Sequence, residues 1–111
     1  MTDRELLELA AKAAGIEVPK HLWADYTDTG IKTMSGLVWN PLTDDGHALR
    51  LAVKLGMILA VRNEGKTDAS VHIENHPHSW QSFLVEHNDD SYAATRRAIV
   101  RAAAEIGKGM K

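Results

Sequence analysis

The clearest structural signal in this chain is Trp39-Asn40-Pro41-Leu42-Thr43-Asp44-Asp45-Gly46-His47-Ala48-Leu49-Arg50-Leu51-Ala52-Val53-Lys54-Leu55-Gly56, which contains both a helix start and a helix end. It predicts a helix over about 44–55, with Thr43 or Asp44 as N-cap, because their side-chain oxygens can accept the free N–H groups of a first turn. Asp44 and Asp45 complement the positive end of the helix dipole, and Gly56 ends the helix. The stripe expected to be buried comprises Ala48, Leu51, Ala52 and Leu55, widened by Leu49 and Val53.

After this helix the apolar residues alternate, which predicts three strands, over 57–62, 68–74 and 81–86. The connections 63–67 and 75–80 are short, so neighbouring strands should be antiparallel. Alternation of this kind indicates a sheet with one buried and one wetter face. The residues expected on the buried face are Met57, Leu59, Val61, Ala69, Val71, Ile73, Phe83 and Val85.

Two more helices are predicted, one at each end of the chain. Thr2 and Glu5 form a capping box for a helix over about 3–14, and Gly15 is placed to end it. Its expected stripe is Leu6, Leu9, Ala10, Ala13 and Ala14. A last helix over about 90–106 should start at Asp89, Asp90 or Ser91 and end before a frayed tail from Gly107. Its inner stripe is expected to be Tyr92, Thr95, Ile99, Ala102, Ala103 and Ile106.

The sequence therefore predicts one α+β domain over residues 1–111, in the order helix, irregular segment, helix, three strands, helix. Helices 44–55 and 90–106 are expected on the buried face of a three-stranded antiparallel sheet. The first helix should close the core beside them in a two-layer fold, or cover part of the opposite face in an alpha-beta-alpha sandwich. Within residues 17–39, Gly36 to Trp39 fits either a short strand or an extended lead-in to Pro41.

Composition excludes several classes of protein. The chain has 44% hydrophobic and 25% charged residues, which is typical of a globular domain, and its net charge of −2 gives no overall attraction to nucleic acid. The absence of cysteine excludes disulfides, thiolate zinc sites and a cysteine nucleophile. No apolar run approaches the ~20 residues of a membrane helix and no leader is seen, so a cytoplasmic protein without membrane contact is expected.

Catalytic and metal motifs are weak. Gly65-Lys66-Thr67 resembles the end of a phosphate-binding loop, but the first glycine of that motif is replaced by Ala60. No serine elbow or paired-histidine helix motif occurs. The loop histidines His72, His76 and His78 leave a metal site open, although two histidines flanking Pro77 usually point apart and are expected to be solvated. We therefore expect no enzyme, no cofactor and no metal ligands.

Nucleic-acid binding is an alternative to these expectations. From residue 44 onward the predicted order of elements is that of double-stranded RNA-binding domains, and Arg96, Arg97 and Arg101 supply basic side chains on the last helix. Such domains hold phosphates with lysines at the start of that helix, where this chain has Asp89 and Asp90. Nucleic-acid binding is the alternative function, and it is disfavoured.

Three blocks of the sequence resemble a family of small bacteriophage and prophage proteins of unknown function. The blocks are Trp39 to Gly56, Asn88 to Ile106, and the opening Leu6 to Ala10 with Ala13 to Gly15, together about half of the chain. The resemblance implies an alpha-beta-alpha sandwich fold and a setting in the cytoplasm of a bacterial host. It implies no reaction, and no functional residues are transferred from it.

The leading functional hypothesis is an accessory protein that binds a host or phage protein. Tryptophan is enriched in protein interfaces, so Trp23, Trp39 or Trp80 would be the anchor if exposed, and would otherwise hold irregular segments onto the core. The candidate binding residues are Trp39, Trp80, Arg97 and Arg101. A homodimer is left open.

Overall fold

The computed structural model describes residues 2–17, 30–33, 38–62, 65–72 and 80–110. Its elements are α1 (Asp3–Ala14), β1 (Ile31–Lys32), β2 (Val38–Trp39), α2 (Asp45–Lys54), β3 (Ile58–Arg62), β4 (Lys66–His72), β5 (Trp80–Glu86) and α3 (Ser91–Lys108). The order confirms the predicted α+β class. The predicted starts and ends of α1 and α2 are also confirmed: the Thr2 hydroxyl and the Asp44 carboxylate accept first-turn N–H groups, while Gly15 and Gly56 adopt positive φ.

The strands β3, β4 and β5 form an antiparallel sheet in sequence order. The register places Leu59 opposite Ala69 and Ala69 opposite Phe83 on one face, as the alternation predicts. Ala69 and Val71 are completely buried on this face. Ile73, predicted to join them, lies outside the described residues.

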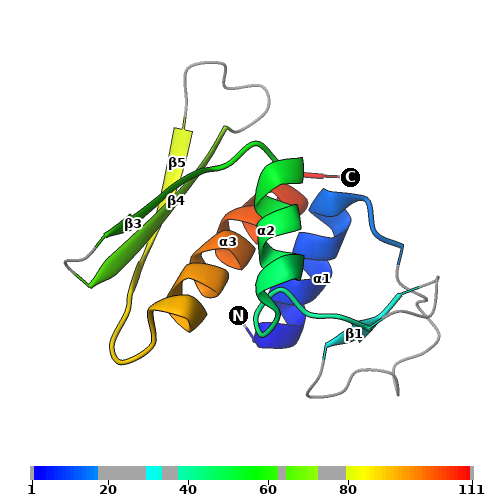
Figure 1. Ribbon diagram of the computed structural model, residues 1–111. Helices are drawn as coiled ribbons and strands as arrows, with labels where there is room; N and C mark the ends of the chain where they lie inside the picture. The colour runs from blue at the N-terminus through cyan, green and yellow to red at the C-terminus, as the bar shows by residue number, and fades with distance from the viewer. Residues whose placement is uncertain (1, 18–29, 34–37, 63–64, 73–79, 111) are drawn as a thin grey trace.

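The helix α3 lies between the sheet and the other two helices (Figure 1). On one side Ala98 and Ala102 pack against Ala69 and Val71 of β4. On its other side α3 packs against α1 and α2. Thus α3 lies along the sheet as predicted, whereas α2 makes its main contact with α3 instead of lying on the sheet face. All three helices lie on the same side of the sheet, so α1 closes the core and does not cover the opposite face.

The crossing of α1 and α3 corrects the predicted helix end. Helix α3 continues to Lys108, and Gly107 is buried where we expected a frayed tail. A Cβ atom at Gly107 would overlap the carbonyl oxygen of Leu9, so the absence of a side chain lets the two helices approach closely. Leu7 and Ala11, outside the predicted stripe, are buried as well.

Within residues 17–39, where a strand and an extended lead-in were both possible, the structure has a two-stranded sheet. Strand β2 pairs antiparallel with β1, with Ile31 opposite Trp39. Both side chains are buried in the helical core. Asn40 then fixes the chain for entry into α2: its side-chain oxygen accepts the Leu42 N–H at 3.0 Å, and its own N–H donates to His47 Nδ1 at 3.0 Å.

Candidate functional site

Four large apolar side chains that the sequence assigned to the core are exposed. The exposed fractions are 60% for Leu49, 73% for Val53, 57% for Val61 and 71% for Tyr92, so these four predictions are wrong. Helix α2 packs through a narrower stripe, Ala48, Leu51 and Ala52. The residue Val61 lies on the edge strand β3, and Tyr92 lies in the first turn of α3, where neighbouring elements do not cover it.

Helical spacing, strand alternation and one ion pair indicate that these four residues lie on the same side of the molecule. The Asp45 carboxylate on α2 meets Arg96 of α3 at 2.6 Å, so this flank of α2 faces α3. Leu49 and Val53 follow Asp45 at intervals of four and share its flank. Tyr92 precedes Arg96 by four residues, which puts it on the side of α3 that faces α2.

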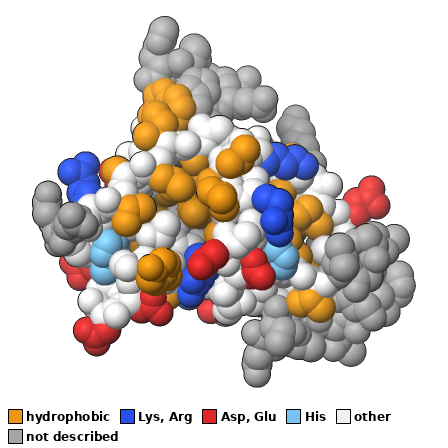
Figure 2. Space-filling view, in the orientation of Figure 1, with side chains coloured by type: hydrophobic (Ala, Val, Ile, Leu, Met, Phe, Trp, Pro, Cys, Tyr) orange, Lys and Arg blue, Asp and Glu red, His pale blue; other side chains and the backbone are white. Residues whose placement is uncertain are grey.

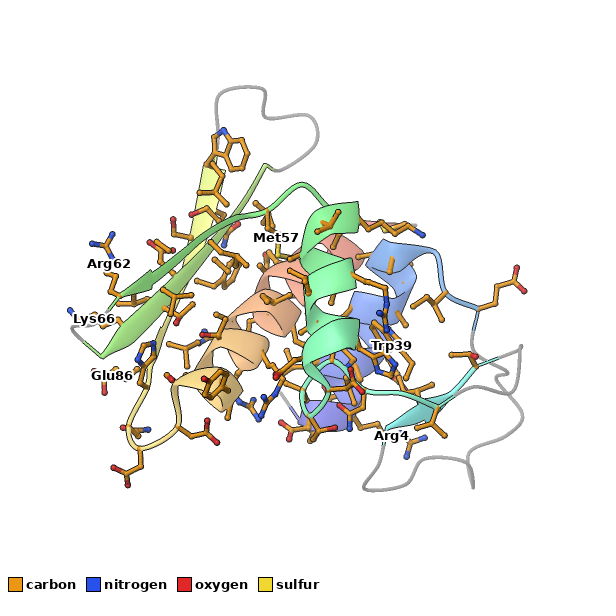
Figure 3. The ribbon with its side chains drawn as sticks, in the orientation of Figure 1. Arg4, Trp39, Met57, Arg62, Lys66 and Glu86 are labelled. Carbon is orange, nitrogen blue, oxygen red and sulfur yellow. The ribbon has the colours of Figure 1, made fainter. Side chains whose placement is uncertain are left out.

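Strand β3 borders the same face. Val61 shares its side of the sheet with Leu59, which packs against the helical core, as does Met57. Met57 lies where the chain passes from α2 into β3 (Figure 3). Hydrophobic side chains gather in this region, between the sheet and α2 (Figure 2). We call this surface, with Leu49, Val53, Val61 and Tyr92 exposed on it, the α2–β3 face.

Four basic residues beside the α2–β3 face are not held in hydrogen bonds or ion pairs within the described part of the chain. Arg50 on α2 and Arg62 at the end of β3 are exposed and form no hydrogen bond or ion pair with any described residue. The same is true of Lys54 and Lys66 a little further out, and Arg62 and Lys66 lie together at one end of the sheet (Figure 3). Of the nearby acids, Asp45 is held by Arg96, and Asp44 caps α2 and also interacts with the charge of Arg50. Arg62, Lys54 and Lys66 therefore place positive charge beside the face, although the chain has a net charge of −2.

Of the predicted anchors that the structure describes, the exposed one is Trp80, on the outer face of the sheet. Trp80 is 49% exposed and shares this face with Ile58 and Leu84. In the middle of the face, Asp68 Oδ1 is buried and has no hydrogen-bond partner. Trp39 is instead buried in the core, where it holds β2 onto the helices, and Trp23 lies outside the described residues.

The three arginines of α3 do not form a basic patch, because each has a different partner. Arg96 donates to the Leu42 carbonyl at 2.8 Å and to Asp45. The Arg97 guanidinium meets Asp3 at 2.9 Å.

The third arginine, Arg101, lies over the Phe83 ring, 6.0 Å from its centroid. Arg101 forms no ion pair with Glu105, four residues further along α3, which meets Lys108 at 3.6 Å. All three guanidinium groups therefore join α3 to a neighbouring element.

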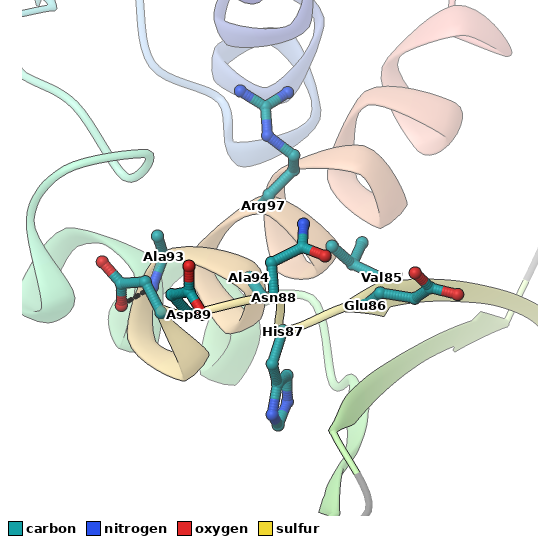
Figure 4. A pocket seen from close by; sticks show the side chains of 9 residues that line it. Val85, Glu86, His87, Asn88, Asp89, Ala93, Ala94 and Arg97 are labelled. Carbon is teal, nitrogen blue, oxygen red and sulfur yellow. Dashed lines mark hydrogen bonds between the residues drawn. The ribbon is translucent and has the colours of Figure 1, made fainter.

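A pocket of about 350 Å³ lies at the turn between β5 and α3. It is lined by Val85, Glu86, His87, Asn88, Asp89, Asp90, Ala93, Ala94 and Arg97 (Figure 4). The acidic residues of this turn disfavour an anionic ligand. Asp90 caps α3 by accepting the Ala93 N–H at 3.0 Å, and Arg97 is engaged by Asp3.

The histidine of this turn is engaged in a partly buried chain of hydroxyl groups, and its ring points away from Arg97 (Figure 4). Thr95 donates to the Ser91 carbonyl at 2.8 Å, so Thr67, 2.9 Å from Thr95, must be the donor between them. Thr67 then accepts from His87 Nε2 at 2.7 Å. His87 is therefore protonated at Nε2, and it fixes the turn to β4 and α3. This network could not be predicted from the sequence, because its members are far apart in the chain.

The histidines on which the metal hypothesis depends lie mainly outside the described residues. His76 and His78 are among the residues that are not described, and the side chain of His72 is not described either. Within the described ranges, no three histidine or acidic side chains gather to hold a metal ion. The described helices include none that is long and apolar enough to span a membrane.

Comparison of the chain with protein-family models, curated proteins and solved structures found no match. A functional interpretation therefore rests on the chemistry of the surfaces.

Proposed function

We propose that this chain is a non-catalytic accessory protein that works by binding another protein, in the cytoplasm of a bacterium that carries the corresponding phage or prophage. The observation that supports binding is the α2–β3 face, to which four exposed large apolar side chains belong. Contiguous exposed apolar patches are characteristic of sites of protein association. The phage setting is supported by the resemblance of the three sequence blocks.

The surface chemistry favours a protein partner over nucleic acid. The arginines Arg96, Arg97 and Arg101, on which the double-stranded RNA alternative depends, are engaged by Asp45, Asp3 and Phe83. Aliphatic and aromatic side chains with arginine at the rim are the composition typical of a protein interface. Nucleic-acid binding therefore remains the second candidate, supported by the order of elements alone.

Affinity capture from a lysate of phage-infected bacteria tests the proposal. The bait is the wild-type chain, compared with the double variant Val53→Asp/Val61→Asp. Because both valines are exposed, the variant should keep its fold, which circular dichroism checks. We expect a protein recovered by the wild type to be reduced about tenfold or more with the variant, since placing a charge in an apolar interface costs more than ~1.4 kcal/mol.

Val38→Asp is the matched control, since Val38 is a half-exposed valine on β2, outside the α2–β3 face. It should recover the same protein as the wild type. Equal recovery by the double variant would contradict the α2–β3 face as the binding surface. Recovery of nothing above background would contradict protein binding itself.

A further inference from the structure

The strand β3 has a free edge beside the α2–β3 face. Among the described strands, β3 pairs only with β4, so the main-chain N–H and C=O groups on its other side have no strand to pair with. Its sequence, Ile58-Leu59-Ala60-Val61-Arg62, contains no proline and no charge before its last residue. Natural sheets usually protect an edge with such features, because an unprotected edge readily pairs with another chain.

Apolar side chains surround the space beside this edge. An added strand would have Leu59 and Val61 as neighbours on the helix side and Ile58 and Ala60 on the outer side. The flank of α2 that carries Leu49 and Val53 borders the helix side as well. Strand β5 is also an edge, but the described residues place no comparable apolar helix flank beside it. The β3 edge is thus the better template.

The charges beside this edge select the partner. Arg62 ends the strand and has no ion pair among the described residues. Arg50 lies on α2 next to the apolar flank, where the Asp44 carboxylate offsets part of its charge. A second copy of this chain docked through the same face would bring two sets of these cations together. Phosphate groups would satisfy the cations but offer no main-chain groups to the strand edge. An acidic polypeptide satisfies both.

We propose that β3 accepts a fourth strand, supplied by an extended segment of the partner protein with apolar residues at alternate positions and acidic residues at its ends. The proposal rests on the proposed function and specifies its partner. Main-chain hydrogen bonds to β3 would provide the binding, and the apolar side chains of Val61 and the α2 flank would select the alternate side chains of the partner. Arg62 and Arg50 would attract the acidic ends.

The probe is a fluorescein-labelled peptide, Glu-Glu-Val-Thr-Val-Thr-Val-Glu-Glu, titrated with the full chain and followed by anisotropy. We expect saturable binding that is weakened about fivefold by Arg62→Glu, which converts an attractive contact into a repulsive one. Val61→Asp should weaken it about tenfold. Hydrogen exchange should show new protection at amides of residues 58–62 in the complex.

Two peptide controls test the binding mode. Two peptides are N-methylated at alternate residues, one at the odd and one at the even positions. Binding should be abolished only in the peptide whose methylated N–H groups would face β3. Replacing every Glu by Lys should reduce binding at least tenfold. Leu84→Asp, on the outer face of the sheet, and Lys108→Glu, at the end of α3, should leave the affinity unchanged.

Several results would overturn the proposal. In the peptide experiments, these are equal binding by both N-methylated peptides, or binding of the lysine peptide as tight as that of the original peptide. Protection of β5 amides instead of β3 amides would also overturn it. So would tighter binding of single-stranded DNA than of the peptide, or a stable dimer of the chain that Val61→Asp dissociates. If the peptide does not bind while capture from lysate still depends on Val53 and Val61, strand addition is wrong and the proposed function stands. If both experiments fail, both proposals fall.

Discussion

Gly107 lies where α1 crosses α3, and the Leu9 carbonyl oxygen occupies the space that a side chain would need. Gly107→Ala should therefore force the helices apart and destabilise the fold by about 1–3 kcal/mol, the usual range for overpacking. Urea denaturation measures this change. Gly109→Ala is the matched control, because a Cβ there meets only the Ile106 carbonyl at an ordinary 3.6 Å. Equal midpoints for the two variants would show that the helices do not cross as closely as described.

The charge on Asp44 should make part of the stability dependent on pH. The pKa of this carboxyl lies below its ordinary value, chiefly because the His47 N–H donates to it, with smaller contributions from the charges of His47 and Arg50 and opposition from burial. A lowered folded-state pKa means that the stabilisation is present above the unfolded value, 3.8, and is lost as the pH falls through the folded value. Asp44→Asn keeps an N-cap but does not titrate.

As the pH falls from about 5 to about 2, the urea midpoint of the wild type should therefore fall more than that of Asp44→Asn. The same titration with Asp89→Asn provides the control, because Asp89 is an exposed acid that caps no helix. A difference that stays constant over this range would contradict the role given to the Asp44 charge.

Among the elements, the turn from β5 into α3 depends on the hydroxyl network around Thr67. Thr67→Val keeps the shape but leaves His87 Nε2 and the Thr95 hydroxyl without their partner. We expect a loss of about 1–3 kcal/mol in unfolding free energy, the cost of unsatisfied buried polar groups. Ser82→Ala removes the exposed Ser70–Ser82 hydrogen bond instead, and it should change the urea midpoint little. A neutral Thr67→Val would mean that water replaces the lost contacts.

The elements themselves were predictable from the sequence because their signals are local. The alternation in 57–62 and 81–86 and the caps at Thr2 and Asp44 involve residues a few positions apart, and the structure confirms them. The layer order was not predictable, because the stripe of α2 gives no information on which neighbour it meets. Only the packed fold shows that α3 has small apolar residues on two sides and takes the sheet face.

The candidate site was predictable only in part, because its chemistry depends on pairs that are distant in the sequence. Arg96 meets Asp45 across 51 positions and Arg97 meets Asp3 across 94, and no spacing rule reveals such pairs. The sequence therefore suggested a basic patch that the fold disperses. One feature of the sequence could have revealed the exposed apolar flank of α2. Leu49 and Val53 make the apolar stripe of this helix wider than packing against one helix requires.

At the scale of the whole molecule, α3 is shared by two hydrophobic clusters. Ile99, Val100 and Ala103 belong to the helical cluster with α1 and α2, whereas Ala98 and Ala102 belong to the cluster with the sheet. A sheet that lost its packing would expose one side of α3. Since a helix in isolation is only marginally stable, the helical cluster should weaken with it. We therefore expect the chain to unfold as one cooperative unit.

Val71→Ala tests this cooperativity, because Val71 is fully buried in the sheet cluster and is not a member of the helical cluster. The substitution should lower the unfolding free energy by about 1–3 kcal/mol. Native-state hydrogen exchange should then show the slowest amides of α1 and of β4 accelerated by the same factor, since both exchange through global unfolding. Acceleration confined to β4 and β5 would mean that the sheet opens alone. The α2–β3 face would then be divided between the sheet and the helical cluster, which separate. A strand bound at β3 would hold these two parts together.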